Sequence, residues 1–226
     1  MKVVPNVHKF VIHLGSLNIY LITDNGELTL IDTGFARSVP RILRIIRLLG
    51  FKPTDLKHIF ITHADIDHAG GINKLKEQTG ANVYASPIAA EALASGRSSR
   101  EIHIDPVGKT IYKKVEEKAF PVGEVDVVLE PDQILPILGG LRVISTPGHT
   151  PCHYSYYLEK EGVLFTGDSL RTLMGAATIN NFKFLIWDKD EMHASFERQH
   201  ALKPRYICPG HGPTLRNASK KFWGLG

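Results

Sequence analysis

Cysteine is scarce in this chain, since only Cys152 and Cys208 occur among its 226 residues. Two cysteines cannot build the disulfide framework of a small secreted protein, and they suit a reducing compartment. No run of about 18 or more uncharged apolar residues occurs. The start of the chain also lacks the basic and continuous apolar segments of a signal peptide. We therefore expect a cytoplasmic protein without a membrane segment.

An excess of charge of one sign is also missing. Twenty-seven Lys and Arg residues stand against 23 Asp and Glu residues, so the net charge is +4 and is spread along the chain. Nucleic-acid-binding domains instead gather basic residues on one face or along one helix. The chain is 43% hydrophobic and long enough to bury a full core without disulfides. These values exclude a mini-protein and predict no nucleic-acid partner.

The first part of the chain shows strand patterns. No internal repeat, low-complexity tract or linker interrupts the sequence, so we expect a single domain over residues 1–226. Apolar patterns at residues 10–14, 17–23 and 27–31 predict strands, and Asn25-Gly26 is typical of a hairpin turn. Antiparallel strands should therefore open the fold.

Helix and strand patterns alternate in the next part. Apolar residues recur at helical spacing after Ser38, which can cap the helix, and Gly50 can end it. Arg41, Arg44 and Arg47 repeat at every third position, and we expect them to form the solvated face of that helix. Further patterns predict strands at 58–62 and 81–85, and helices at 73–78 and 88–94.

Strand patterns return in the second half, at residues 119–146 and 153–166. A helix pattern at 189–201 and a strand pattern at 206–208 follow. Two β-rich halves, each with helices after its strands, predict an α/β protein in which two mixed sheets pack together with helices outside, a four-layer αββα sandwich. Residues 95–118 fit neither half and are expected to form a loop or a helical insertion.

The strongest chemical signal lies directly after the strand predicted at 58–62. Four side chains that can bind metal stand within six residues there, namely His63, Asp65, Asp67 and His68. Such a cluster can be merely polar in a solvated loop. Here an apolar strand precedes it and a pair of glycines follows it, which favours a built site.

Three further candidate ligands each follow a glycine at a predicted strand end: His149, Asp168 and His211. Glycine suits the tight turns that such positions need. Each residue alone is more often structural. Together with the cluster they make four histidines and three carboxylates, which are the donors that two divalent metal ions require.

With these residues the sequence resembles the metallo-β-lactamase-fold superfamily. The hallmark of that superfamily is a His-x-His-x-Asp-His cluster followed by a distant His, an Asp and a final His. The resemblance covers nearly the whole chain and implies the αββα sandwich. It also implies a ligand set: His63, Asp65 and His149 for the first metal, Asp67, His68 and His211 for the second, and Asp168 as a bridge.

Three neighbouring residues complete the expected site. Asp32 is expected either to bond the N–H of a ligand histidine or to cap the turn before Thr33-Gly34. His153, four residues after His149, is expected to support the site without binding metal. Cys152 is expected to be a small buried residue.

Asp65 departs from the family pattern, because most members carry histidine there. A third carboxylate makes the site less positive, so it should acidify a bound water less. Carboxylate also shifts preference from zinc towards manganese or iron, although the Irving–Williams order favours zinc over both. We therefore expect two divalent metal ions, zinc first, with iron or manganese as alternatives because of Asp65.

The resemblance implies a dinuclear metal-dependent hydrolase that acts on a small ester, thioester or lactone through a metal-bound hydroxide. Asp67 is the candidate catalytic residue, which orients or deprotonates the attacking water. The alternative is a di-iron redox or oxygen-binding sensor protein, since di-iron members carry a carboxylate at the position of Asp65. In either case the expected partner is a small molecule, not a nucleic acid or a membrane. The basic residues of 95–118, Arg97 and Arg100 among them, could form a small cap over the site for an acidic substrate, although acidic residues of the segment dilute their charge.

Overall fold

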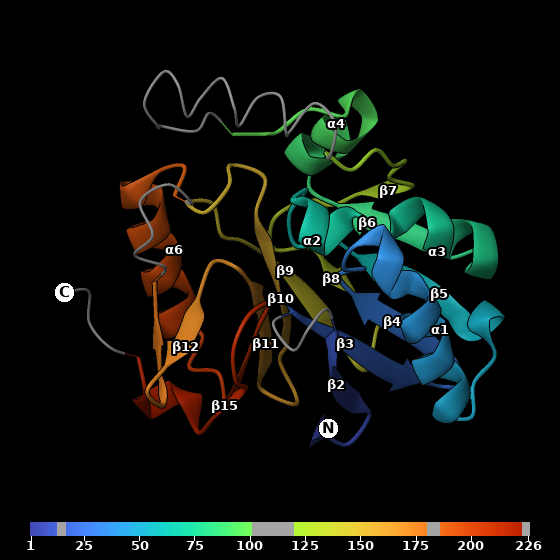
Figure 1. The fold of residues 1–226 in the computed structure, drawn as a ribbon. Coiled ribbons are helices and arrows are strands. Elements are labelled where there is room, and N and C mark those ends of the chain that lie inside the picture. Colours follow the sequence, from blue (N-terminus) through green and yellow to red (C-terminus); the bar gives the residue numbers. More distant parts are fainter. Residues whose placement is uncertain (13–16, 101–119, 180–185, 223–226) are drawn as a thin grey trace.

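Two mixed β-sheets lie face to face in the computed structural model, which describes residues 1–12, 17–100, 120–179 and 186–222 (Figure 1). The first sheet has seven strands, antiparallel from β1 to β4 and parallel from β4 to β7. In spatial order they are β1 (Lys2–Val4), β2 (Val7–Ile12), β3 (Leu17–Asp24), β4 (Glu27–Ile31), β5 (Leu56–Phe60), β6 (Asn82–Ala85) and β7 (Val127–Val128).

The second sheet has six strands in the spatial order β15-β14-β11-β10-β9-β8. Only β11 and β14 pair in parallel. Its strands are β8 (Ile134–Leu135), β9 (Leu141–Ser145), β10 (Tyr154–Leu158), β11 (Val163–Gly167), β14 (Tyr206–Pro209) and β15 (Leu215–Arg216). A separate hairpin pairs β12 (Arg171–Leu173) with β13 (Ala176–Thr178).

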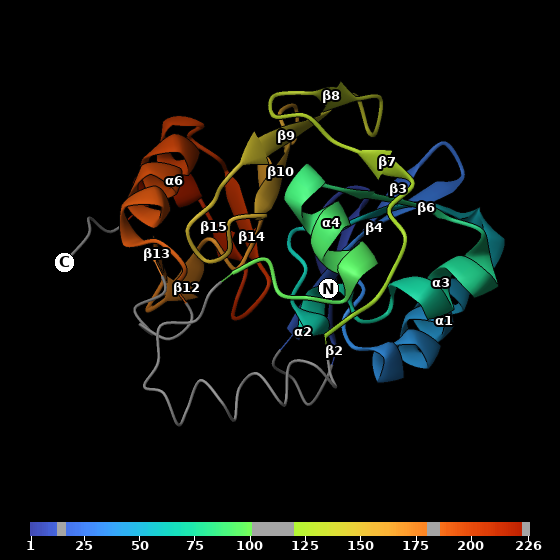
Figure 2. The ribbon, with the colours of Figure 1, turned by 90° about the horizontal axis from the view of Figure 1, so that it is seen from above.

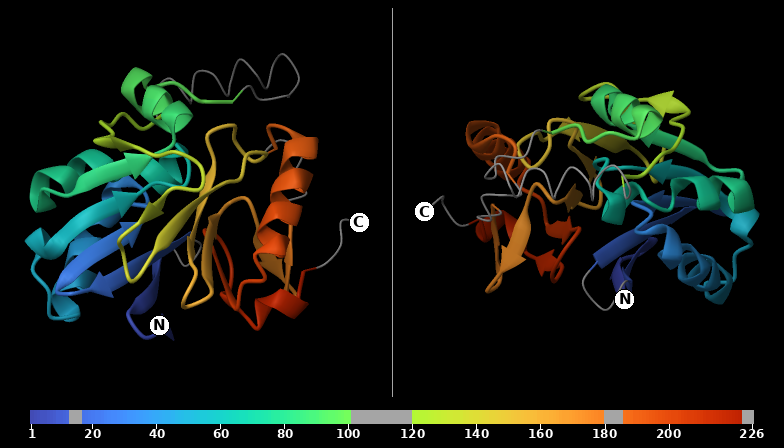
Figure 3. Two further views of the ribbon diagram at one scale, coloured as in Figure 1. Left: turned by 180° about the vertical axis from the view of Figure 1, so that it is seen from behind. Right: turned by 45° about the horizontal axis from the view of Figure 1, so that its top comes forward.

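Helices cover the outer faces of both sheets (Figure 3). Four of them, α1 (Val39–Leu48), α2 (Ile66–Ala69), α3 (Ile72–Thr79) and α4 (Pro87–Ser95), lie on the side of the first sheet, and α6 (Lys189–Ala201) lies on the side of the second. The view from above shows the same order of layers (Figure 2). Short 3-10 turns occupy Ala36–Ser38, Pro53–Asp55 and Ala218–Lys220. Among the described residues, no helix is long and apolar enough to cross a membrane.

Three apolar layers hold the sheets and helices together. Period-two alternation along β3 sends Ile19 and Leu21 towards the helices and Tyr20 and Ile22 towards the second sheet. Between the sheets, Phe60 stacks on the neighbouring ring of the first sheet and packs edge-on against a tyrosine of the second. On the far side, Phe196 of α6 belongs to a third cluster over the second sheet. The predicted αββα sandwich is confirmed.

Element positions agree with the sequence patterns in most places. Asn25-Gly26 connects β3 and β4, and the guanidinium groups of α1 are exposed as expected. Ser38 occupies the N-cap position of α1 as predicted, but it also ends a 3-10 turn and its side chain makes no capping hydrogen bond. Gly50 ends the helix as predicted, with a positive φ of 87°. Residues 101–119, most of the predicted insertion, lie outside the described residues.

Four strand ends meet at one edge of the sandwich. β4 and β5 of the first sheet are parallel, as are β11 and β14 of the second. Parallel strands deliver the residues after their carboxyl ends to the same edge. Asp32 follows β4, His63 follows β5, Asp168 follows β11 and His211 follows β14. The fold therefore brings these four side chains together, because each one directly follows a strand that ends at this edge.

Candidate metal centre

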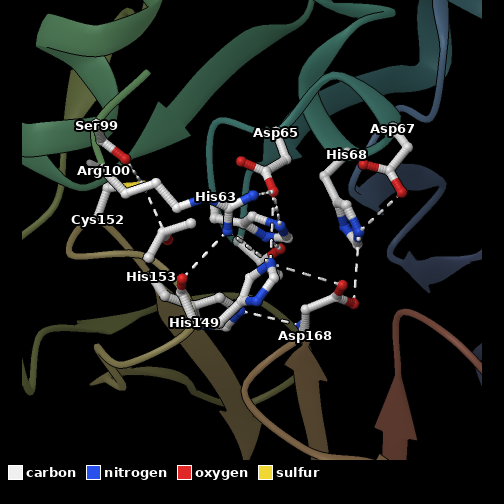
Figure 4. A network of polar contacts seen from close by, with 12 residues as sticks. His63, Asp65, Asp67, His68, Ser99, Arg100, His149, Cys152, His153 and Asp168 are labelled. Atoms are coloured by element: carbon white, nitrogen blue, oxygen red, sulfur yellow. Dashed lines mark hydrogen bonds and ion pairs between the residues drawn. The ribbon is translucent and has the colours of Figure 1, made fainter. Parts of the chain in front are cut away.

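The seven predicted ligands come together at this edge, and Figure 4 labels all of them except His211. His63 and Asp65 lie between β5 and α2, Asp67 and His68 lie in α2, and His149 lies between β9 and β10. Asp168 and His211 complete the set from the second sheet. Asp168 and His211 from the second sheet, and His149 from the loop between β9 and β10, therefore meet the His63–His68 cluster, which follows β5 of the first sheet.

Two triads of donor atoms share the site. In the first, Asp65 Oδ2 lies 3.6 Å from His63 Nε2 and 3.4 Å from His149 Nε2. In the second, Asp67 Oδ2 lies 3.3 Å from His211 Nε2 and 3.8 Å from His68 Nε2. Within each triad the donor atoms lie within 4.8 Å of one another.

Asp168 lies between the triads. Its Oδ1 is 3.5 Å from His68 Nε2, while its Oδ2 is 3.8 Å from His149 Nε2 and 3.6 Å from His211 Nε2. One carboxylate therefore faces histidines of both triads, which is the position that a bridging ligand needs.

The donor spacing fits metal ions of ordinary size. Four ligands placed tetrahedrally at about 2.0–2.2 Å from a zinc ion are about 3.3–3.6 Å from one another. The measured distances between donor atoms span 3.3–3.8 Å. Moreover, the Nε2 atoms of His63 and His68 are buried without a hydrogen-bond partner among the described residues. Buried polar atoms are rarely left so, and a metal ion would satisfy both.

Asp32 orients two of the histidines. Its Oδ2 accepts a hydrogen bond from His68 Nδ1 at 2.8 Å and another from the Thr62 hydroxyl at 2.9 Å. The same hydroxyl oxygen lies 3.0 Å from His63 Nδ1 and accepts a hydrogen bond from it, since its own proton goes to Asp32. Both rings therefore have a proton on Nδ1 and turn Nε2 into the site. Of the two roles considered for Asp32, the structure shows the bond to a candidate ligand.

His153 holds the backbone of Asp168 in place. Its Nε2 accepts a hydrogen bond from the backbone N–H of Asp168 at 3.1 Å, and its Nδ1 lies 2.9 Å from the Thr146 hydroxyl. Both ring nitrogens are thus engaged by protein atoms, in agreement with a supporting role. Cys152 is buried as expected.

Burial and neighbouring charges shift the pKa values of several groups in the site. Burial opposes a charge on His68, but the carboxylates of Asp67, Asp32 and Asp168 raise its pKa to about 10. Burial and then the neighbouring histidines lower the pKa of His63 well below its usual value. Burial also disfavours the Asp67 carboxylate, yet His68 and His211 lower the pKa of Asp67 overall. Negative charge thus dominates around the second triad.

Sequence reasoning placed Arg100 in a possible basic cap over the site, but did not predict its contact with a candidate ligand. Its Nη2 donates a hydrogen bond to Asp65 Oδ2 at 2.7 Å, and its side chain is only 6% exposed. Burial favours the neutral carboxyl, but Arg100 and then His149 outweigh it and lower the pKa of Asp65. The two residues are 35 positions apart. No spacing rule connects an arginine after one helix with an aspartate before another.

Comparisons with known proteins agree with this geometry. The family model described as the metallo-beta-lactamase superfamily matches residues 14–211. The uncharacterized protein YobT of Bacillus subtilis (strain 168) is 30% identical to the chain, with 91% of this chain and 87% of YobT covered.

Two relatives with described activities are similar over most of this chain. A hydroxyacylglutathione hydrolase of Methylobacterium sp. (strain 4-46) is 30% identical, with 81% of this chain covered. An atrochrysone carboxyl ACP thioesterase of Aspergillus fumigatus is 26% identical, with 92% of this chain covered. This chain spans 59% and 54% of the lengths of these two relatives, respectively.

Among solved structures, a metallo-beta-lactamase of Cronobacter sakazakii with a HARLDQ motif superposes with a TM-score of 0.70 at 30% identity. The superposition covers 92% of this chain and 76% of the other. Its motif shares the first, second and fifth letters with the HADIDH of residues 63–68 here. Fold, candidate metal centre and family model lead to one conclusion: the chain belongs to the metallo-β-lactamase superfamily and is one of its metal-dependent hydrolases.

Proposed function

We propose that this protein hydrolyses a small ester, thioester or lactone with two divalent metal ions. The observation that supports this most is the pair of donor triads joined by Asp168. The first metal would bind His63, Asp65 and His149, and the second Asp67, His68 and His211. When bound, such ions would acidify a water molecule and stabilise the negative charge that develops on an attacked carbonyl oxygen.

The substrate class draws support from the relatives. The names of two of them describe hydrolysis of acylated thiols, by a thioesterase and by a hydroxyacylglutathione hydrolase. Thioesters, esters and lactones share an acyl carbon that water can attack, so one arrangement of charge serves all three. A donor set rich in imidazole, together with the Irving–Williams order, favours zinc.

The protein's own groups perform the remaining tasks. Asp67 lies in the second triad, and its side chain is 29% exposed, so it can reach both the centre and an incoming water. With Oδ2 turned to the histidines, its other oxygen would take a proton from the attacking water and return it to the leaving group. Asp32 and His153 would hold the ligands in place through their hydrogen bonds to His68 and to the backbone of Asp168.

The competing di-iron proposal rested on the carboxylate of Asp65. In the structure that carboxylate is paired with Arg100, which weakens it as a ligand for a hard ion. The hydrolase is therefore the function that the geometry supports better.

Metal analysis combined with hydrolysis assays tests the proposal. The purified protein, stripped of metal and reloaded with zinc, should cleave 4-nitrophenyl acetate, an S-acylglutathione or γ-decalactone well above its metal-free form. An iron content above that of zinc in freshly purified protein, visible absorption and no hydrolysis of the three substrates would instead establish the di-iron alternative.

A further inference from the structure

The guanidinium of Arg100 reaches into the first donor triad (Figure 4). Nη2 donates to Asp65 Oδ2 at 2.7 Å, and Nη1 donates to the backbone carbonyl of His149 at 3.1 Å. Nη1 also lies 3.3 Å from His149 Nε2. Arg100 thus contacts two of the three donor atoms that the first metal would use.

Hydrogen bonds in the segment that follows α4 hold Arg100 in this place. Ser98 bonds both the N–H and the carbonyl of Arg100 through its hydroxyl, which shapes the turn. The Ser99 hydroxyl donates to Cys152 Sγ at 3.2 Å, which ties the turn to the loop that follows His149. The position of Arg100 is therefore part of the folded structure and not a free surface rotamer.

Arginine competes with a metal ion for the same lone pairs. A guanidinium only donates hydrogen bonds, so its contact with His149 Nε2 uses the lone pair that a metal would need. It also supplies a positive charge that is already paired with Asp65 in a buried setting. A second cation placed there would be repelled by Arg100 at short range.

The second triad has a different surrounding. Among the described residues, the charged partners of Asp67 and Asp168 are histidines alone. A divalent ion at Asp67, His68 and His211 thus meets two carboxylates and no arginine of the described chain. The two triads therefore present different net charges to an incoming metal ion.

We propose that Arg100 acts as a built-in cation that makes the site of His63, Asp65 and His149 the weaker and later of the two metal sites. This inference rests on the proposed metal-dependent function. It assigns a reason for Asp65 as well, because a histidine in that position could not neutralise the buried guanidinium. Occupancy of the first site, and with it the dinuclear state, would then depend on free metal concentration.

An alternative role for Arg100 makes the opposite prediction. If the guanidinium only orients Asp65 as a ligand, its removal should weaken the first site, as loss of an outer partner of a ligand usually does. If it competes with the metal, its removal should strengthen that site. The sign of the change therefore separates the two roles.

Calorimetric titration of the metal-free full chain with zinc tests the proposal, and native mass spectrometry counts the ions bound. The wild type should take up one zinc tightly and a second at least about tenfold more weakly. Arg100→Met should strengthen the second step by at least about tenfold and leave the first unchanged. His149→Ala assigns the steps, because it should abolish the weaker one.

Two further variants control the experiment. Arg97→Met removes a neighbouring exposed guanidinium and should leave both steps at wild-type values. Arg100→Lys keeps the charge and should hold the second step within about threefold of the wild type, even if Arg100→Met proves poorly folded by circular dichroism.

Three results would overturn the inference. The first is two zinc ions bound with equal affinity by the wild type. The second is a second binding step that is weakened or unchanged in Arg100→Met. The third is a second binding step in Arg100→Lys that is as tight as the first. A wild-type chain that binds no zinc would refute the proposed function together with the inference. Metal binding with an unaltered Arg100→Met profile would refute the inference alone.

Discussion

At the scale of single residues, Asp32 is the group that prepares the site. Its carboxylate fixes His68 directly and His63 through the Thr62 hydroxyl. Its backbone adopts a positive φ of 60°, which is costly for most residues and tolerated by aspartate. One strand-end aspartate thus determines which nitrogen of two candidate ligands faces the centre of the site.

Replacing Asp32 by asparagine should therefore weaken metal binding without removing a ligand. We expect Asp32→Asn to lower zinc affinity by about 10–100-fold, because the charge that makes the histidines better donors is lost. Titration with zinc against a coloured chelator measures the change. Asp132→Asn, on a side chain that is 70% exposed, should bind zinc as the wild type does. Equal affinity in both variants would contradict the orienting role.

Alanine variants of Asp168 and His153 should distinguish a metal ligand from a residue that only supports a ligand. Asp168→Ala removes the carboxylate between the triads, so metal content and ester turnover should fall together. His153→Ala should keep nearly full metal content but lose about 1–3 kcal/mol of stability, because the partly buried N–H of Asp168 loses its partner. Elemental analysis and urea unfolding measure the two effects. Equal metal loss in both variants would make His153 a ligand.

Proton release on metal binding follows from the pKa of His68. Burial opposes its charge, yet Asp67, Asp32 and Asp168 raise that pKa to about 10, so without metal the ring keeps its proton through neutral pH. The metal needs the lone pair, and binding must expel this proton. Apparent zinc affinity should thus rise by about tenfold per pH unit between about pH 6 and 8 for one proton released. Chelator competition at several pH values measures the slope, and a flat profile would disprove the coupling.

At the scale of elements, the turn after β11 shows how closely the strand ends approach. Gly167 has a φ of +46°, and a Cβ there would lie 2.6 Å from the Thr62 hydroxyl oxygen and 2.7 Å from His153 Nε2. No side chain fits between the two sheets at this point. The glycine before Asp168 is therefore required by space as well as by backbone conformation.

Gly167→Ala should consequently destabilise the fold by roughly 2–4 kcal/mol, through strain and overpacking together. Gly175→Ala is the matched control. Gly175 has a similarly positive φ of +84° but nothing within 4 Å of a new Cβ, so only backbone strain of about 1–2 kcal/mol applies. Chemical denaturation of both variants gives the comparison. A Gly167→Ala variant no less stable than Gly175→Ala would show that the turn can relax.

Most elements could be predicted because their patterns are local. The helical spacing of α1 and the Asn25-Gly26 turn depend on neighbours in the sequence, and both appear where expected. Ser38 stands at the predicted N-cap without a side-chain capping bond, because its backbone continues the 3-10 turn before this helix, whereas a capping serine has extended backbone. The contact of Arg100 with Asp65 could not be predicted, since it depends on the tertiary bond between the segment after α4 and the loop of Cys152.

At the scale of the whole molecule, metal binding should join the two halves of the sandwich. The His63 to His68 cluster comes from the first sheet, while Asp168 and His211 come from the second. Ions shared between them stabilise only the folded chain, in which these residues meet.

Metal removal should therefore lower thermal stability. A ligand present at about 100 times its dissociation constant stabilises the folded state by about 2.7 kcal/mol. For a chain of this length that corresponds to a melting temperature about 5–11 °C higher. Differential scanning calorimetry with a chelator and then with added zinc measures the shift. A melting temperature that zinc does not restore would argue against ions bound between the halves.

The most direct test of the central claim is a zinc titration of the metal-free protein in which bound zinc and the rate of 4-nitrophenyl acetate hydrolysis are measured on the same samples. The account predicts little turnover without metal, full turnover only once the second zinc ion is bound, and neither tight binding nor turnover in Asp168→Ala. Full turnover of the metal-free protein, or stoichiometric zinc binding in which Asp168→Ala behaves as the wild type, would contradict it.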